Sequence, residues 1–150
     1  QYTKYFISTT MTLGESHNFL KGFIDIVYIH NTGGAWGMLS GYTWVLLALT
    51  AIVMIICIVL LVKTGTKNKL LFWAISLVVS GGTGNMIDRI FRDGNVVDFL
   101  HFEFFPTFPI FNVADIAVVV GAGLLILYFI IDAVKKTKKA KIVPESQENE

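Results

Sequence analysis

The sequence is poor in charge and nearly free of cysteine. Charged residues make up 15% of its 150 residues, whereas a soluble domain usually has about a quarter. The single cysteine, Cys57, excludes an internal disulfide and a cysteine-based metal site. Because the three histidines (His17, His30 and His101) lack metal-ligand spacing, we expect no metal and no other cofactor. The net charge of +1 gives no reason to expect a nucleic-acid partner.

Long apolar runs stand in place of the missing charge, and hydrophobic residues reach 54% of the chain. Residues 44–62, 70–87 and 113–131 each approach the roughly 20 residues that cross a hydrocarbon core. The first two runs contain no charge, and the third has one aspartate near its start. A buried soluble helix would explain one such run. Three of them predict an all-α polytopic membrane protein, a helix bundle in which residues 1–150 form a single integral membrane domain.

The positions of the lysines predict the orientation of the chain. Eight of the twelve basic residues lie in 63–69 and 135–141, which share one side if every run crosses the membrane. The positive-inside rule places them in the cytoplasm, so residues 1–43 and 88–112 lie outside. A chain that starts outside needs an upstream membrane helix, and we therefore expect four spans in the full protein. Residues from about 142 to 150 are expected to form a disordered cytoplasmic tail.

The external segment 19–29 is rich in β-branched and aromatic residues and predicts a strand or hairpin, a small extracytoplasmic β element. Several aromatic side chains in and after it, among them Phe23, Tyr28 and Trp36, are of the type that lies at the membrane interface. A glycine-rich turn over residues 30–37 follows this segment, and it is either an ordinary loop or a place where the backbone approaches a ligand.

Two aspartates, Asp98 and Asp115, lie near the predicted outer membrane boundary among apolar neighbours. A carboxylate there is costly, which makes each one a functional candidate. The alternative for Asp115 is a structural role, in which it accepts hydrogen bonds from free amides at a helix N-terminus. The segment between the two contains Pro106 and Pro109 and can fold back to bring them together.

Two adjacent carboxyls share a proton, because they cannot easily both ionise. One can then activate water while the other donates to a peptide carbonyl, as in an aspartic protease. Near the second run, Asn85 is suited to hydrogen bonding with the backbone or a substrate. Asp88 and Arg89 are suited to an ion-pair network, and Arg89 alternatively to lipid phosphate.

With these motifs in view, the chain resembles the lipoprotein signal peptidases, the type II signal peptidases of bacteria. The resemblance extends from Gln1 to about Lys135. Five ordered motifs carry it: Gln1-Tyr-Thr-Lys4, Asn31-Thr-Gly33, Gly84-Asn85-Met-Ile-Asp88-Arg89, Val97-Asp98-Phe99 and Phe111-Asn112-Val-Ala114-Asp115. The family's first motif begins with an aspartate before the glutamine, and this sequence starts at the glutamine. Gly34 stands where the family often has alanine.

The resemblance implies a four-helix aspartic endopeptidase of the bacterial cytoplasmic membrane, with its site at the extracytoplasmic face. We expect the protein to be a monomer. Its implied substrates are prolipoproteins that carry diacylglycerol on a cysteine, and it cuts just before that cysteine. Asp98 and Asp115 match the catalytic pair. The other family positions around the site are matched by Lys4, Asn31, Gly33, Asn85, Arg89, Asn112 and Ala114.

Two other classes of membrane protein also use paired aspartates. Intramembrane proteases of the presenilin type carry a Gly-x-Gly-Asp motif within a helix, but Asp115 follows Ala114, so this match fails. A transporter or ion-binding protein would use the aspartates as a cation site. Such a site favours carboxylates near the bilayer midplane, whereas Asp98 and Asp115 are predicted at the rim.

Overall fold

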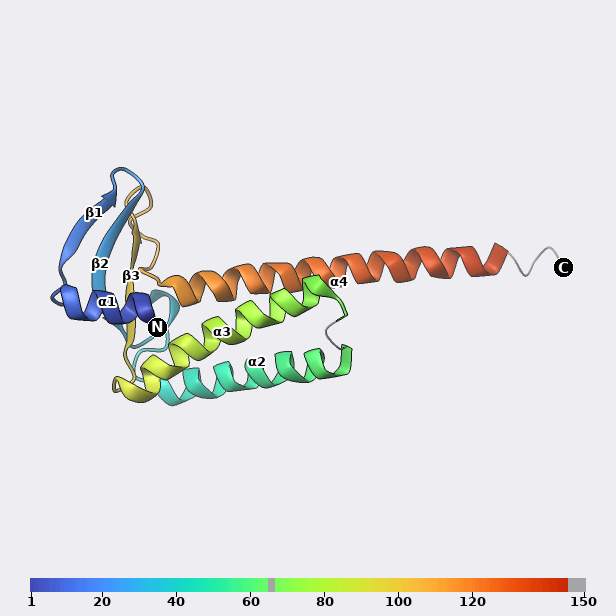
Figure 1. The fold of residues 1–150 in the computed structure, drawn as a ribbon, viewed down its shortest axis with the longest axis horizontal. Helices are drawn as coiled ribbons and strands as arrows, with labels where there is room; N and C mark the ends of the chain where they lie inside the picture. The colour runs from blue at the N-terminus through green and yellow to red at the C-terminus, as the bar shows by residue number, and fades with distance from the viewer. Residues whose placement is uncertain (65–66, 146–150) are drawn as a thin grey trace.

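The computed structural model describes residues 1–64 and 67–145, and it combines a bundle of long helices with a small sheet at one end (Figure 1). The long helices are α2 (Thr43–Thr64), α3 (Lys69–Phe91) and α4 (Val113–Glu145). Each contains a segment long and apolar enough to cross a membrane. The prediction of a helical membrane protein with three spans in this chain is confirmed.

The middle helix of the bundle is α3, which lies between α2 and α4 (Figure 1). In its most apolar window 33% of the residues are buried, compared with 6% in each of the other two helices. Glycines allow α3 and α4 to pack closely, because a Cβ on Gly81 would overlap the Ala114 carbonyl oxygen. A Cβ on Gly121 would lie 2.8 Å from the Ala74 carbonyl oxygen. Such small residues fix the distance between membrane helices.

The sheet is antiparallel with strand order β1-β2-β3, formed by β1 (Ser16–Leu20), β2 (Ile24–Asn31) and β3 (Val96–Phe102). The strand or hairpin predicted over residues 19–29 is confirmed, in the form of a hairpin of β1 and β2. The third strand follows α3 and pairs Asp98 with Ile29 of β2. The sheet therefore joins the N-terminal segment to the loop between the second and third spans.

A short helix, α1 (Tyr2–Thr10), precedes the sheet and does not follow from the sequence pattern. Its Ile7 packs into an apolar cluster with Tyr28, Val97 and Phe99 of the sheet. The helix lies against the sheet with its N-terminal end beside α3 (Figure 1). This position brings Lys4 within reach of the end of α3.

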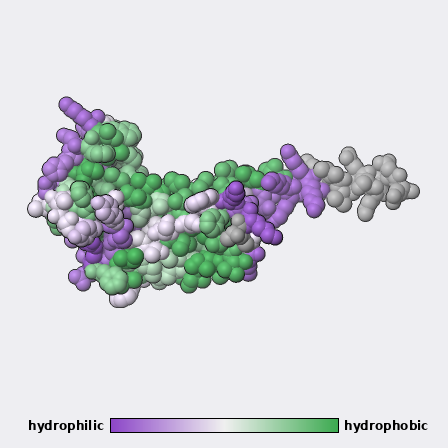
Figure 2. Space-filling model, in the orientation of Figure 1, coloured by the Kyte–Doolittle hydropathy of each residue, from purple (hydrophilic) through white to green (hydrophobic). Residues whose placement is uncertain are grey.

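Hydrophilic residues gather at the two ends of the molecule, and apolar residues cover much of the bundle between them (Figure 2). The C-terminal end of α2 and the N-terminal end of α3 lie at the end of the bundle away from the sheet (Figure 1). Helix α4 continues to Glu145, so the first part of the segment expected to be disordered from about residue 142 is helical instead. Residues 146–150 of that expected tail lie outside the described residues.

Candidate active site

Asp115 lies in the first turn of α4, where local hydrogen bonds fix its position. The Asn112 side-chain oxygen accepts from the backbone N–H groups of Ala114 and Asp115 at 2.7 and 3.2 Å. In return, Oδ2 of Asp115 accepts from the Asn112 backbone N–H at 2.9 Å. This reciprocal pattern is a capping box that satisfies free amides at the helix start. The structural role considered for Asp115 is therefore present, and it leaves the Oδ1 atom for a second partner.

Asp98 lies on β3 and is buried, with 2% of its surface exposed. Its Oδ2 atom accepts from the Asn31 side-chain amide at 2.7 Å, and its Oδ1 atom accepts from the Asn112 side-chain amide at 2.6 Å. Asn31 is held in turn by the backbone N–H of Gly33, which donates to its side-chain oxygen at 3.0 Å. Gly33 is tightly enclosed, because a Cβ there would lie 2.7 Å from the backbone of Gly37.

The two aspartates lie in one cavity and are bridged by Asn112, which is fully buried. Its side chain donates to Asp98, while its backbone donates to Asp115. We call this space of about 330 Å³ the dyad cavity. Its lining includes Asn31, Asn85, Arg89, Asp98 and Asp115, together with the apolar Val96, Phe111, Val118 and Val119. Among the described residues that line it, two carry carboxyl groups and none is a serine, threonine or cysteine.

Burial sets the acid–base behaviour of Asp98. It raises the pKa of this carboxyl from 3.8 to about 6, against the opposing effect of the hydrogen bonds from Asn31 and Asn112. The nearby charge of Asp115 raises the pKa further, and the charge of Lys4 lowers it. A carboxyl with such a pKa can hold or release a proton near neutral pH, as acid–base catalysis requires.

A buried cation, the ammonium group of Lys4, supports the site through contacts with α3. Lys4 is 2% exposed, and its Nζ atom donates to Asp88 Oδ2 and to the side-chain oxygen of Asn85, both at 2.7 Å. The Asn85 amide is thereby oriented so that its Nδ2 atom donates to Asp115 at 2.7 Å. Asp88 also accepts from the backbone N–H of Val97 at 3.1 Å and pairs with Arg92 at 3.4 Å. The same cluster therefore fixes the strand that carries Asp98.

Of the ion-pair network expected at Asp88 and Arg89, the structure contains only the part at Asp88. Within residues 1–64 and 67–145, the partners of Asp88 are Lys4 and Arg92, and Arg89 has no carboxylate within 4.0 Å. Arg89 instead lines the dyad cavity, with Nη1 3.5 Å from the Asn85 backbone oxygen. Asp88 supports the site, a role that the sequence analysis did not assign to it. Its signal was a carboxylate near the end of an apolar helix.

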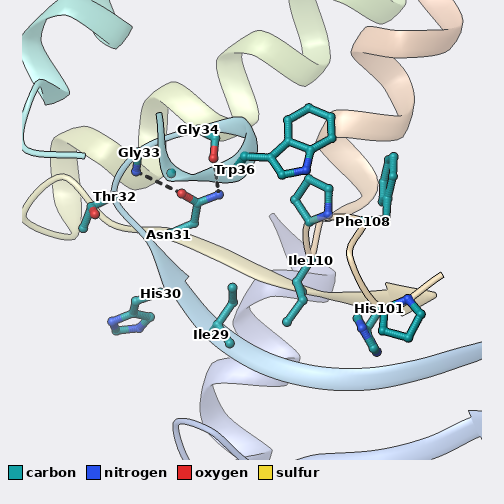
Figure 3. A pocket seen from close by; sticks show the side chains of 13 residues that line it. Ile29, His30, Asn31, Thr32, Gly33, Gly34, Trp36, His101, Phe108 and Ile110 are labelled. Atoms are coloured by element: carbon teal, nitrogen blue, oxygen red, sulfur yellow. Dashed lines mark hydrogen bonds between the residues drawn. The ribbon is translucent and has the colours of Figure 1, made fainter. Parts of the chain in front are cut away.

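Two aromatic side chains form part of the wall of the dyad cavity. Trp36 and Phe108 meet edge to face with ring centroids 6.1 Å apart, and both line the dyad cavity. Figure 3 shows the two side chains facing each other above the strands. Phe104 and Phe105 are at least half exposed and lie outside this lining. In the part of the chain that the structure describes, no group of three or more histidine, cysteine, aspartate or glutamate residues is arranged to hold a metal ion.

Comparisons with known proteins place this geometry in context. A family model for signal peptidase (SPase) II matches residues 1–131. A lipoprotein signal peptidase of Bacillus pumilus is 43% identical over 141 residues, covering 93% of this chain and 90% of that protein. One of Enterococcus faecalis is 40% identical over 141 residues, covering 94% and 86%. A bacterial membrane enzyme solved by the in meso method at 2.3 Å superposes with a TM-score of 0.82 at 38% identity, covering 91% of this chain and 83% of the other.

Proposed function

The chain belongs to the signal peptidase II family, and from this premise we propose that it is an aspartic endopeptidase using Asp98 and Asp115 as its catalytic pair. Membership supports a membrane protease that removes signal peptides from prolipoproteins. The proposal adds that the substrate carries diacylglycerol on a cysteine and is cut just before that residue. The observation that carries the catalytic assignment is the joining of both carboxyls to Asn112 in one cavity.

In the proposed reaction the pair shares one proton at the start. The ionised carboxylate takes a proton from water, and the water oxygen attacks the peptide carbonyl. The protonated carboxyl donates to the carbonyl oxygen and stabilises the charge that develops there. The carbon–nitrogen bond then breaks, and a proton passes from the pair to the departing amine of the cysteine. The amides of Asn31, Asn85 and Asn112 hold the carboxylates in place throughout.

The position of the dyad cavity supports the proposal that the substrate is lipidated. Its wall includes Val118 and Val119, which follow Asp115 along the span of α4. A substrate whose acyl chains stay in the bilayer can therefore present its peptide from the side. Each buried methylene contributes about 0.8 kcal/mol, so two acyl chains anchor the substrate firmly. The lysine-rich end of the bundle lies opposite the sheet, so we place the site at the extracytoplasmic face.

Cleavage of a purified, diacylglyceryl-modified precursor tests the assignment. Asp98→Asn and Asp115→Asn should each lower the rate by about 10³-fold, because either change removes a proton-transfer group. Asp93→Asn is the matched control, since Asp93 is exposed in a turn with φ of 52°, a conformation that asparagine also adopts. Substantial turnover by either dyad variant would contradict the assignment. Equal rates on the same precursor without its lipid would contradict the claim about the substrate.

A further inference from the structure

Helix α4 (Val113–Glu145) is longer than a bilayer requires. Asp115 lies in its first turn, at the outer boundary of the membrane, and Lys135 follows twenty residues later. At 1.5 Å per residue this stretch spans about 30 Å, which is the thickness of a hydrocarbon core. Figure 1 shows that α4 continues well past the ends of α2 and α3 on that side. The turns that follow Lys135 therefore project beyond the rest of the bundle, into the layer of lipid headgroups.

The projecting part of α4 is strongly basic. It contains four exposed lysines (Lys135, Lys136, Lys138 and Lys139), and Figure 2 shows hydrophilic surface over this region. Lys136 has a partner, because its Nζ atom lies 2.8 Å from the carboxylate of Asp132 one turn earlier. The other three stand at positions i, i+3 and i+4, which places their side chains next to one another on one face of the helix. We call Lys135, Lys138 and Lys139 the lysine triad.

The three ammonium groups of the lysine triad repel one another. Like charges four residues apart destabilise a helix, yet α4 continues through the triad to Glu145. Among the side chains that the structure describes, no carboxylate lies within 4.0 Å of the triad. An anion bound among the three lysines would remove this repulsion. It would also supply the partner that the described part of the chain does not provide.

We propose that the lysine triad binds the phosphate group of an anionic phospholipid in the cytoplasmic leaflet. The depth of the triad favours a lipid as the source of this phosphate. The headgroup layer is roughly 5–7 Å thick on each side of the core, and Lys139 lies about 6 Å past Lys135 along the helix. Basic clusters directly beyond a membrane helix attract anionic lipids, and each lysine near the surface strengthens binding about fivefold. The site is separate from the carboxyl pair, because it lies at the opposite end of α4 from Asp115.

Mass spectrometry of the intact protein, released from detergent micelles with its bound lipids, measures this preference directly. The micelles contain equal amounts of phosphatidylglycerol, which is anionic, and phosphatidylcholine, which has no net charge. A salt concentration of about 0.15 M screens attraction beyond roughly 8 Å. The test variant is Lys135→Gln/Lys138→Gln/Lys139→Gln, which removes the charges of the triad. The corresponding triple replacement by arginine keeps the charges, so it separates their loss from any change in the helix.

Three other lysines supply a matched control. Lys63→Gln/Lys67→Gln/Lys69→Gln removes the same number of exposed charges at the same end of the bundle, from the end of α2 to the start of α3. These lysines do not share the i, i+3, i+4 spacing of the triad on one helix. A general effect of net charge would therefore appear equally in both glutamine variants, whereas a site on α4 would appear only in the first.

We expect the wild type to retain phosphatidylglycerol over phosphatidylcholine by at least about fivefold, the contribution of a single lysine. The glutamine variant of the triad should lose most of this preference, while its arginine counterpart and the control variant should keep it. No preference in the wild type, or an equal loss in the two glutamine variants, would overturn the inference. So would a short RNA that displaces the lipid from the wild type, because that result would assign the triad to nucleic acid. Cleavage activity does not enter this measurement, so its outcome is independent of the proposed function.

Discussion

Replacing Lys4 by methionine removes a cation from the interior while keeping most of the side-chain volume. The Lys4 and Asp88 side chains are 3% and 0% exposed, with a separation of 2.7 Å. Loss of the ammonium group leaves the Asp88 carboxylate buried with weaker partners, Arg92 at 3.4 Å and the Val97 N–H at 3.1 Å. Breaking a buried pair in this way costs about 3–5 kcal/mol. Because two partners remain, we expect the lower end, about 3 kcal/mol of unfolding free energy.

Another carboxylate with a close lysine partner supplies the control. Lys136 and Asp132 are 2.8 Å apart, but their side chains are 78% and 38% exposed. Lys136→Met should therefore leave the free energy of unfolding nearly unchanged, because exposed ion pairs contribute little to stability. Adding Asp88→Asn to Lys4→Met removes the buried charge, and it should restore a measurable part of the lost stability, since residues in contact couple.

Denaturant unfolding in detergent micelles measures these stabilities, and cleavage of the lipidated precursor at several pH values measures the effect on the site. The rate should fall as pH rises through the pKa of Asp98, about 6, because the pair then loses its shared proton. Burial chiefly raises that pKa and the Lys4 charge lowers it, so Lys4→Met should move the alkaline limb to higher pH. Equal destabilisation by Lys4→Met and Lys136→Met, or no recovery with Asp88→Asn, would refute the reasoning.

Three further outcomes are expected. Gly121→Ala should lower the free energy of unfolding by about 1–3 kcal/mol, because its Cβ would lie 2.8 Å from the Ala74 oxygen across the α3–α4 contact. Gly123→Ala should be neutral in the same unfolding assay, because its Cβ would have nothing within 4 Å. The raised pKa of Asp98 means that its contribution to stability is present below pH 3.8 and lost as pH rises through about 6. Between the lower and the upper end of that window, the free energy of unfolding of the wild type should fall by up to about 3 kcal/mol relative to that of Asp98→Asn. A difference between the two proteins that stays constant with pH would contradict the shift. A cysteine introduced at Asn68 should react with an impermeant reagent only after the membrane is opened, and labelling from outside intact cells would reverse the topology.

The spans and the first hairpin could be predicted because their signals are local. An apolar run of sufficient length has few alternatives to a membrane helix, and the β-branched and aromatic segment 19–29 has the composition of strands. Strand β3 (Val96–Phe102) escaped prediction because it is defined by pairing with β2, more than sixty residues earlier in the chain. Helix α1 (Tyr2–Thr10) was not predicted, because its helical structure depends on packing against the sheet through Ile7.

The candidate site could be anticipated as a pair of costly carboxylates, but the directions of its hydrogen bonds could not. Lys4 only donates and ionised carboxylates only accept, so each amide between them has one orientation that satisfies both ends. The Asn85 oxygen accepts from Lys4 and from Asn112 at 2.7 and 3.1 Å, which turns its nitrogen toward Asp115. The Asn112 oxygen caps α4, which turns its nitrogen toward Asp98. These partners lie up to 81 residues apart, a relation that no local pattern encodes. Only the folded chain shows that Lys4 orients the Asn85 amide toward Asp115, while the cap of α4 orients the Asn112 amide toward Asp98.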